Sequence, residues 1–201
     1  MTESIFTLEE ATRKKEIINT SLKIIDQNGI KGLTVARIAE EVGFSEAALY
    51  RHFKSKKEII SLILEEVHTL ARSNFAEIKK SAKNSTEELR LLLKIHLEFL
   101  EEFPGLFKII YSDEIHIGES SLLEKLQLLL GEIIESIQGI VQQGKKAGVF
   151  KSNVDAAIAA IHFLGIVQTA FSYWTIGGRK ISLVKTGDKL ISQFFAGIST
   201  S

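Results

Sequence analysis

Three helix starts follow one another in a short stretch, and their spacing restricts the fold more than any other feature of this sequence. Each start has a hydroxyl side chain of the kind that caps a helix N-terminus, at Thr34, Ser45 and Ser55. The pattern predicts a helix over 34–42, a turn at Gly43 and a second helix over 45–53, which together form a helix-turn-helix unit. Because the turn is so brief, the two helices must cross steeply, and the second one stays exposed.

The second helix of this unit has one apolar side and one mixed side. Leu49 and Phe53 are four residues apart and face the preceding helix, which predicts that they are buried. Between Arg51 and Lys57 the chain carries four Lys and Arg side chains and no acidic one. The outer side of the helix carries Glu46, Ala47, Tyr50 and Arg51, with Ala48 and His52 at its edge. Small side chains allow close approach to bases, and basic or hydroxyl side chains bind phosphate oxygens, so this surface suits the major groove of DNA.

The rest of the chain is a series of helical patterns, so the expected fold class is all-α. A first helix begins at a capping-box pattern over 7–10 and ends at Asn28. A long helix starts at Ser55, and we expect it to begin a larger helical domain over 55–201, after a helix-turn-helix domain over 1–54. Further helices are expected at 85–102, 104–113, 119–146, 153–176 and 182–198.

Composition and missing motifs exclude several classes of function. The 201 residues include no cysteine, which removes disulfides and thiolate chemistry. The chain lacks a glycine-rich phosphate loop and a nucleophile elbow, and the grouping of Asp113, Glu114 and His116 matches no zinc signature. We therefore expect no enzymatic activity, no cofactor and no metal. Lys+Arg and Asp+Glu are 25 each, so any contact with DNA must come from a local basic patch.

The location of the protein follows from the absence of two signals in the sequence. No apolar run reaches the roughly 20 residues that a membrane span needs. The N-terminus carries acidic residues where a signal peptide would carry basic ones. We expect a cytoplasmic protein without a membrane segment.

The run NGIKGLTVARIAEEVGFSEAALYRHFKSKKEII, from Asn28 to Ile60, resembles the DNA-binding domain of the TetR family of transcriptional regulators. The resemblance covers roughly the first 60 residues by motif, and the remaining two thirds agree in length and helical character. The family pattern is matched at Gly32, Thr34, Ile38, Ala39, Val42, Gly43, Leu49, Tyr50, His52, Phe53, Lys56 and Glu58.

The resemblance implies a homodimer that places two recognition helices in successive major grooves of a palindromic operator. By the family pattern, Thr34, Val35, Tyr50 and Lys56 would contact the DNA backbone, and Glu46, Ala47, Ala48 and His52 would face bases or flanking phosphates. Ala36 departs from the tetracycline repressor, which has a base-reading arginine there, and Arg37 is the nearest substitute. The full set of expected DNA-binding residues is Thr34, Val35, Arg37, Ser45, Glu46, Ala47, Ala48, Tyr50, Arg51, His52 and Lys56.

Two further sets of residues are expected in the larger domain. The effector pocket is expected at His96, Phe99, Phe103, Phe107, Tyr111 and Ile137, where aromatic residues cluster; the other interpretation is that these side chains fill the core. The dimer interface is expected at Ala156, Ala160, Phe163, Val167, Phe171 and Trp174, in a segment that is apolar almost all round; the other interpretation is burial within one subunit.

Three functions remain open from the sequence. The first is a homodimeric repressor that a small, largely apolar effector releases from its operator. A second, narrower resemblance connects the segments FSEAALYRHFKSK and FPGLFKII with the nucleoid-occlusion members of the same family, which implies a DNA-binding protein that acts through a protein partner. The third is a helical dimeric enzyme, against which the intact DNA-reading surface argues.

Overall fold

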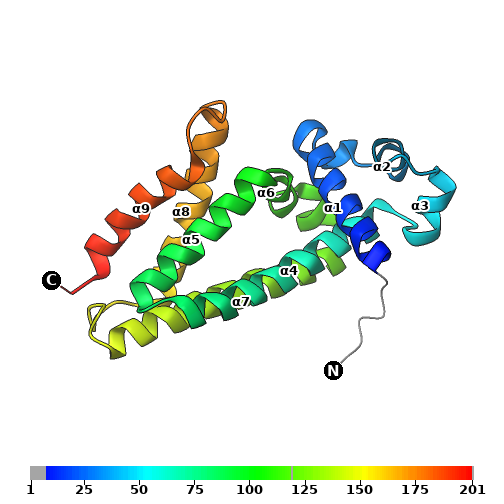
Figure 1. Ribbon diagram of the computed structural model, residues 1–201. Helices are drawn as coiled ribbons and strands as arrows, with labels where there is room; N and C mark the ends of the chain where they lie inside the picture. The colour runs from blue at the N-terminus through cyan, green and yellow to red at the C-terminus, as the bar shows by residue number, and fades with distance from the viewer. Residues whose placement is uncertain (1–7, 119, 201) are drawn as a thin grey trace, which may run out of the picture. The chain divides into compact units, whose positions relative to one another are not determined.

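The computed structural model describes residues 8–118 and 120–200, which are almost entirely helical, so the predicted all-α class is confirmed (Figure 1). The α-helices are α1 (Leu8–Asn28), α2 (Val35–Val42), α3 (Glu46–His52), α4 (Lys56–Ser81), α5 (Ser85–Glu102), α6 (Gly105–Ile110), α7 (Ser120–Lys146), α8 (Ala156–Ile176) and α9 (Leu183–Ile198). Two short elements join them, the 3₁₀ helix η1 (Ile30–Gly32) and the π-helix η2 (Glu114–Gly118). These bounds agree with the predicted helices to within a few residues, except after α6.

The segment after α6 differs from its prediction. A helix was expected over 104–113, but α6 ends at Ile110, and the chain turns at Tyr111 before the π-helix η2 begins at Glu114. The wider turn of a π-helix has no hydrophobic period of its own that a sequence would show. The capping box expected over 7–10 begins at Thr7, which lies outside the described residues.

The three predicted helix starts have the hydrogen bonds that their sequences indicate. Oγ1 of Thr34 accepts from the amide of Arg37 at 3.1 Å, and Oγ of Ser45 accepts from the amide of Ala48 at 3.2 Å. At the third start, Oγ of Ser55 accepts from the Glu58 amide at 3.4 Å, and Oε2 of Glu58 accepts from the Lys54 amide at 2.8 Å, one residue before the cap. Gly43 takes the left-handed conformation with φ of 77°, so the turn between α2 and α3 depends on glycine.

The chain divides into two compact units, each with its own contacts. The first unit consists of Met1–Val67 and Phe103–Leu126, and the second of His68–Glu102 and Gln127–Ser201. The first unit therefore includes α6 and the start of α7 in addition to the helices around the predicted helix-turn-helix segment. Within it α1 packs against α2 and α6, and α2 packs against α3, around fully buried side chains such as Ile25.

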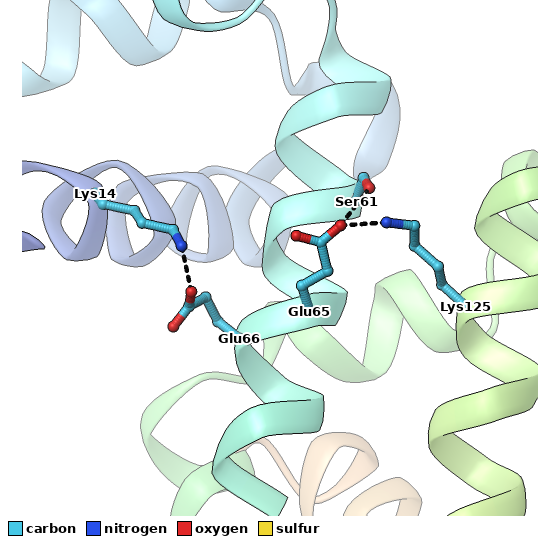
Figure 2. A network of polar contacts seen from close by, with 5 residues as sticks. All are labelled: Lys14, Ser61, Glu65, Glu66 and Lys125. Carbon is cyan, nitrogen blue, oxygen red and sulfur yellow. Dashed lines mark hydrogen bonds and ion pairs between the residues drawn. The ribbon is translucent and has the colours of Figure 1, made fainter. Parts of the chain in front are cut away.

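Two adjacent carboxylates on α4 fasten three helices of the first unit together, as Figure 2 shows. Glu66 pairs with Lys14 of α1, and Glu65 pairs with Lys125 of α7 and also accepts a hydrogen bond from Ser61. The Lys125 ammonium group holds the pKa of Glu65 below its ordinary value, although partial burial opposes this. These ion pairs hold α4 to α1 on one side and to α7 on the other.

The second unit is built around three mutually packed helices, α5, α8 and α9 (Figure 1). Gly187 of α9 lies so close to Leu97 of α5 that a methyl group at Gly187 would meet the Leu97 side chain. The carboxylate of Glu101 accepts a hydrogen bond from the Leu183 amide at 2.7 Å, which satisfies a free donor at the start of α9. The α5–α9 packing is thus supported by close approach and by a hydrogen bond.

Helix α8 corrects one expectation about the sequence. By length and composition it is long and apolar enough to cross a membrane, whereas no such run was expected. Its inner side is packed in the second unit, where Ala160 and Phe163 are fully buried. Its outer side exposes large apolar residues, namely Ile158, Ile161, Tyr173 and Ile176. A core helix or a helix that pairs with another protein surface passes the same test, so the finding bears first on what covers this outer side.

Candidate nucleic-acid interface

Helix α3 presents the mixed surface that the sequence predicts. Leu49 is fully buried and faces Ile38 and Ala39 of α2, which are buried as well. On the other side Tyr50 is 47% exposed. The remaining exposed positions of this surface are Ser45, Glu46, Ala47 and Arg51, with Ala48 half-buried at its edge. The turn before α3 is supported from α1, because the Arg13 guanidinium lies over the Phe44 ring at 5.8 Å from its centroid.

Two residues expected to bind DNA through α2 have different environments. Thr34 is exposed at the N-terminus of α2, so its hydroxyl hydrogen remains available for a phosphate oxygen while its oxygen caps the helix. The side chain of Val35 is 5% exposed and belongs to the core, so only its backbone amide, at the first turn of α2, is placed to donate outward. Arg37 is half-buried. The side chain of His52 lies outside the described part of the structure.

Lys56, an expected phosphate ligand, is engaged within the protein. Its ammonium nitrogen lies 2.6 Å from Oε2 of Glu114, and both side chains are 32% exposed. Glu114 belongs to the π-helix η2, far away in the sequence, and no local pattern around Lys56 indicates this partner. A phosphate group must compete with the Glu114 carboxylate for the Lys56 ammonium group.

The Lys56–Glu114 ion pair makes a direct prediction about DNA affinity. Glu114→Gln should strengthen binding to any duplex about two- to fivefold, because a partly exposed ion pair of this kind is worth up to about 1 kcal/mol and its loss frees Lys56 for phosphate. The measurement is a fluorescence anisotropy titration of a duplex at 50 and 200 mM salt. Glu124→Gln, which removes the same charge from an exposed position of α7, is the control and should change affinity much less. Equal gains in both variants would attribute the effect to net charge alone.

The six residues expected to form an effector pocket are divided between the two units. Phe103, Phe107 and Tyr111 belong to the first unit, where the Phe107 and Tyr111 rings lie 4.5 Å apart between centroids and Tyr111 is 52% exposed. In the second unit, Nδ1 of His96 lies 3.0 Å from the Leu92 carbonyl oxygen, and burial lowers the pKa of His96. The two others in the second unit are Phe99 and the fully buried Ile137.

The residues expected at a dimer interface are mostly buried inside one protomer. Ala160 and Phe163 are fully buried, and Val167, Phe171 and Trp174 are at most 9% exposed, which leaves them little surface for a second copy. Ala156 is half-buried. The sequence is apolar on all sides of α8 and therefore does not show which side faces the protomer's own core. The exposed apolar residues of α8 lie at other positions of the same helix.

The described residues contain no group of three His, Cys, Asp or Glu side chains that could hold a metal ion. Of the acidic and histidine residues noted near position 114, Glu114 is paired with Lys56, and Nε2 of His116 lies 2.8 Å from the Ile110 carbonyl oxygen.

The fold and the exposed α3 surface define a helix-turn-helix DNA-binding protein, and comparison with known families agrees. Residues 17–63 match the model of bacterial regulatory proteins of the tetR family, and residues 64–197 match that of the YsiA-like protein, C-terminal region. The chain therefore belongs to the TetR family, and it is a transcriptional regulator of that family. The resemblance noted in the sequence is confirmed over both parts of the chain.

Similar proteins include members with two different roles. The nucleoid occlusion factor SlmA of Vibrio cholerae is 29% identical over 161 residues, covering 80% of this chain and 82% of that protein. The fatty acid metabolism regulator protein of Bacillus subtilis is 25% identical over 184 residues, covering 91% and 94%. The crystal structure of the transcriptional regulator FadR from Bacillus subtilis in complex with stearoyl-CoA is 25% identical, with a TM-score of 0.76 and coverage of 92% and 98%.

Proposed function

We propose that this protein is a homodimeric repressor that binds a palindromic operator through α3 and leaves it when a small, largely apolar effector binds. The observation that carries the proposal is the exposed α3 surface, held by a capped N-terminus and a buried Leu49 and free of bulky side chains at Ala47 and Ala48. Family regulators bind DNA and generally have no enzymatic activity, which supports a cytoplasmic regulator rather than an enzyme.

The proposed partner in the dimer is a second copy of the chain, bound at the outer side of α8. Ile158, Ile161, Tyr173 and Ile176 are each at least half exposed and lie along one helix, so together they form an apolar stripe. A twofold axis next to this stripe would bring it against its own copy, as in other isologous interfaces. We therefore place the interface on these residues, on the side of α8 opposite to Phe163.

The proposed mechanism is a shift between two arrangements of the dimer. In one, the two α3 helices are spaced to enter successive major grooves, roughly 34 to 36 Å apart; in the other they are not. An effector changes the balance only as far as it binds one arrangement more tightly. The stearoyl-CoA in the Bacillus subtilis FadR structure supports fatty acyl compounds as the first effectors to test.

A second candidate function is supported by the SlmA relatives. At 29% identity over four fifths of this chain, they favour binding at dispersed chromosomal sites together with a protein partner. The regulator of fatty acid metabolism is aligned over more of the chain, and its FadR counterpart shares the fold, so we place the local repressor first.

A footprint of the purified protein on the DNA flanking its own gene, at two salt concentrations, separates these functions. A protected palindrome that Tyr50→Ala abolishes would support a local repressor and supply the probe for effector screening. Binding that is salt-sensitive and not localised would favour the dispersed chromosomal role. Absence of binding at both salt concentrations, for protein freed of ligand by unfolding and refolding, would refute both.

The α3 surface predicts two kinds of effect on DNA binding. Tyr50→Phe and Lys56→Ala should weaken binding to every sequence, by about three- to tenfold each, because each change removes one hydrogen bond or charge directed at phosphate. Ala47→Gln and Ala48→Gln should instead alter the preferred bases, since these positions face the groove floor. Binding selections on a randomised operator measure both effects. A uniform loss for all four variants would refute this division of roles.

A further inference from the structure

A small cavity lies between α4 and α7 within the second unit, away from every residue discussed above. Its volume is about 210 Å³. Helix α4 lines it with His68, Arg72 and Phe75, and α7 lines it with Glu132, Ile133 and Ser136. The cavity thus combines an apolar part, at Phe75 and Ile133, with a charged part at the other three positions and a hydroxyl group.

The charged part of the cavity is arranged around one carboxylate. Oε2 of Glu132 lies 2.9 Å from Nε2 of His68 and 3.8 Å from Nε of Arg72. His68 and Arg72 are one helical turn apart on α4, so both cations approach the same oxygen. The His68 imidazole, with a smaller contribution from Arg72, holds the pKa of Glu132 below its ordinary value, so this carboxylate is ionised at neutral pH.

The resident carboxylate satisfies its two partners poorly. Although Nε2 of His68 is close to Glu132 and buried from solvent, it makes no hydrogen bond of acceptable direction. The Arg72 nitrogen at 3.8 Å is beyond hydrogen-bond distance, and its side chain is 72% exposed, so most of its five donors point to solvent. The carboxylate itself is 38% exposed and therefore free to move outward. A carboxylate supplied from outside could make better-aligned bonds to both cations.

We propose that this cavity binds a small organic carboxylate, which takes the place of Glu132 between His68 and Arg72 and lays its hydrocarbon part against Phe75 and Ile133. The chemistry of the ligand follows from the resident group, because these two cations already hold a carboxylate. The size follows from the volume, which is below the roughly 300 Å³ at which pockets for drug-sized ligands begin. The ligand is either a short free carboxylate or the carboxylate end of a longer amphiphile.

Glu132 acts in this proposal as a competitor for the ligand. An incoming carboxylate must displace Glu132, which keeps both cations paired in the empty state and disfavours weak or uncharged ligands. Binding itself is independent of the proposed repressor function; only the further step, in which occupancy releases DNA, rests on it.

The test is calorimetric titration of the full-length protein, without DNA, using hexanoate, decanoate and the uncharged hexan-1-ol. Hexanoate should bind and hexan-1-ol should not. Glu132→Gln should bind hexanoate about three- to tenfold more tightly, because the competitor is removed, whereas Arg72→Gln should bind it about tenfold more weakly. Lys80→Gln, which removes an exposed cation elsewhere on α4, is the control and should bind as the unmodified protein does. A gain of affinity in Glu132→Gln cannot result from loss of folding.

Each outcome decides the proposal. Equal binding of hexanoate and hexan-1-ol, no binding of hexanoate, or no gain in Glu132→Gln would overturn it. If the gain is seen, decanoate distinguishes the two ligand sources: much tighter binding than hexanoate indicates the end of an amphiphile, and similar binding indicates a short carboxylate. Operator binding by the same variants is measured separately. Carboxylate binding without any effect on DNA would keep the site and remove only its link to the repressor function.

Discussion

Gly105→Ala is expected to lower the free energy of unfolding by about 2 kcal/mol, because it places an atom where the backbone of α1 already lies. A Cβ at Gly105 would come within 2.1 Å of the Leu22 carbonyl oxygen and 2.9 Å of its carbon. These neighbours belong to the middle of a long helix and cannot move as a side chain does, so α6 has to separate from α1. The separation would also weaken the contacts of Lys108 with Asp26, whose carboxylate lies 3.4 Å from the ammonium group.

The measurement is chemical or thermal unfolding followed by circular dichroism, and the midpoint temperature should fall by about 4 to 8 °C. Gly139→Ala in α7 is the matched control, because a Cβ there meets nothing within 4 Å and a helix interior favours alanine over glycine by roughly 0.5 to 1 kcal/mol. The control should therefore be slightly stabilised. A neutral result for Gly105→Ala would show that the α1–α6 packing is looser than these distances indicate.

The DNA-reading part of the fold was predicted from the sequence because its determinants are local. The caps at Thr34 and Ser45 bond to amides three residues ahead, and the turn needs one glycine, so neighbouring residues define both helices. The 2.1 Å approach at Gly105 is different. It depends on a residue more than 80 positions away, and a glycine next to Pro104 indicates only a helix start.

Other features could not be predicted because they depend on distant partners. Lys56 was expected to be free for phosphate, but Glu114 of the π-helix holds it. His68 was noted only as one of several scattered histidines, since Glu132, which makes it part of a charged cavity, lies on another helix. A sequence indicates that such side chains are ionisable, whereas the packing of α4 against α7 decides which of them meet.

Helix α8 shows a third limit of sequence patterns. A helix with apolar residues on every side gives no moment that distinguishes its core side from a side that binds a partner. Phe163 and Ile161 are both apolar and two positions apart, yet Phe163 is fully buried and Ile161 is 57% exposed. Burial within the protomer therefore had to be known before the pairing side could be proposed.

Ile161→Asp is expected to weaken the proposed homodimer at least about a hundredfold, which is the largest effect on function that we predict. In an isologous interface each copy contributes the same residue, so one substitution places two carboxylates in an apolar contact. Because the Ile161 side chain is exposed in the protomer, the change should leave the monomer folded. Sedimentation velocity between 1 and 50 µM should show a monomer for the variant and a dimer for the unmodified protein.

Leu128→Asp is the matched control for this prediction. Leu128 is 56% exposed on α7, so the same change in charge and volume is made at an equally exposed apolar position outside α8. The control should sediment as the unmodified protein does, and a monomer in the control or an unaltered dimer in Ile161→Asp would place the interface elsewhere. Operator affinity should fall together with dimerisation, because one reading head alone contacts one half-site and loses the advantage of a linked second contact. The oligomeric state and the loss of DNA binding therefore test the same surface by independent measurements.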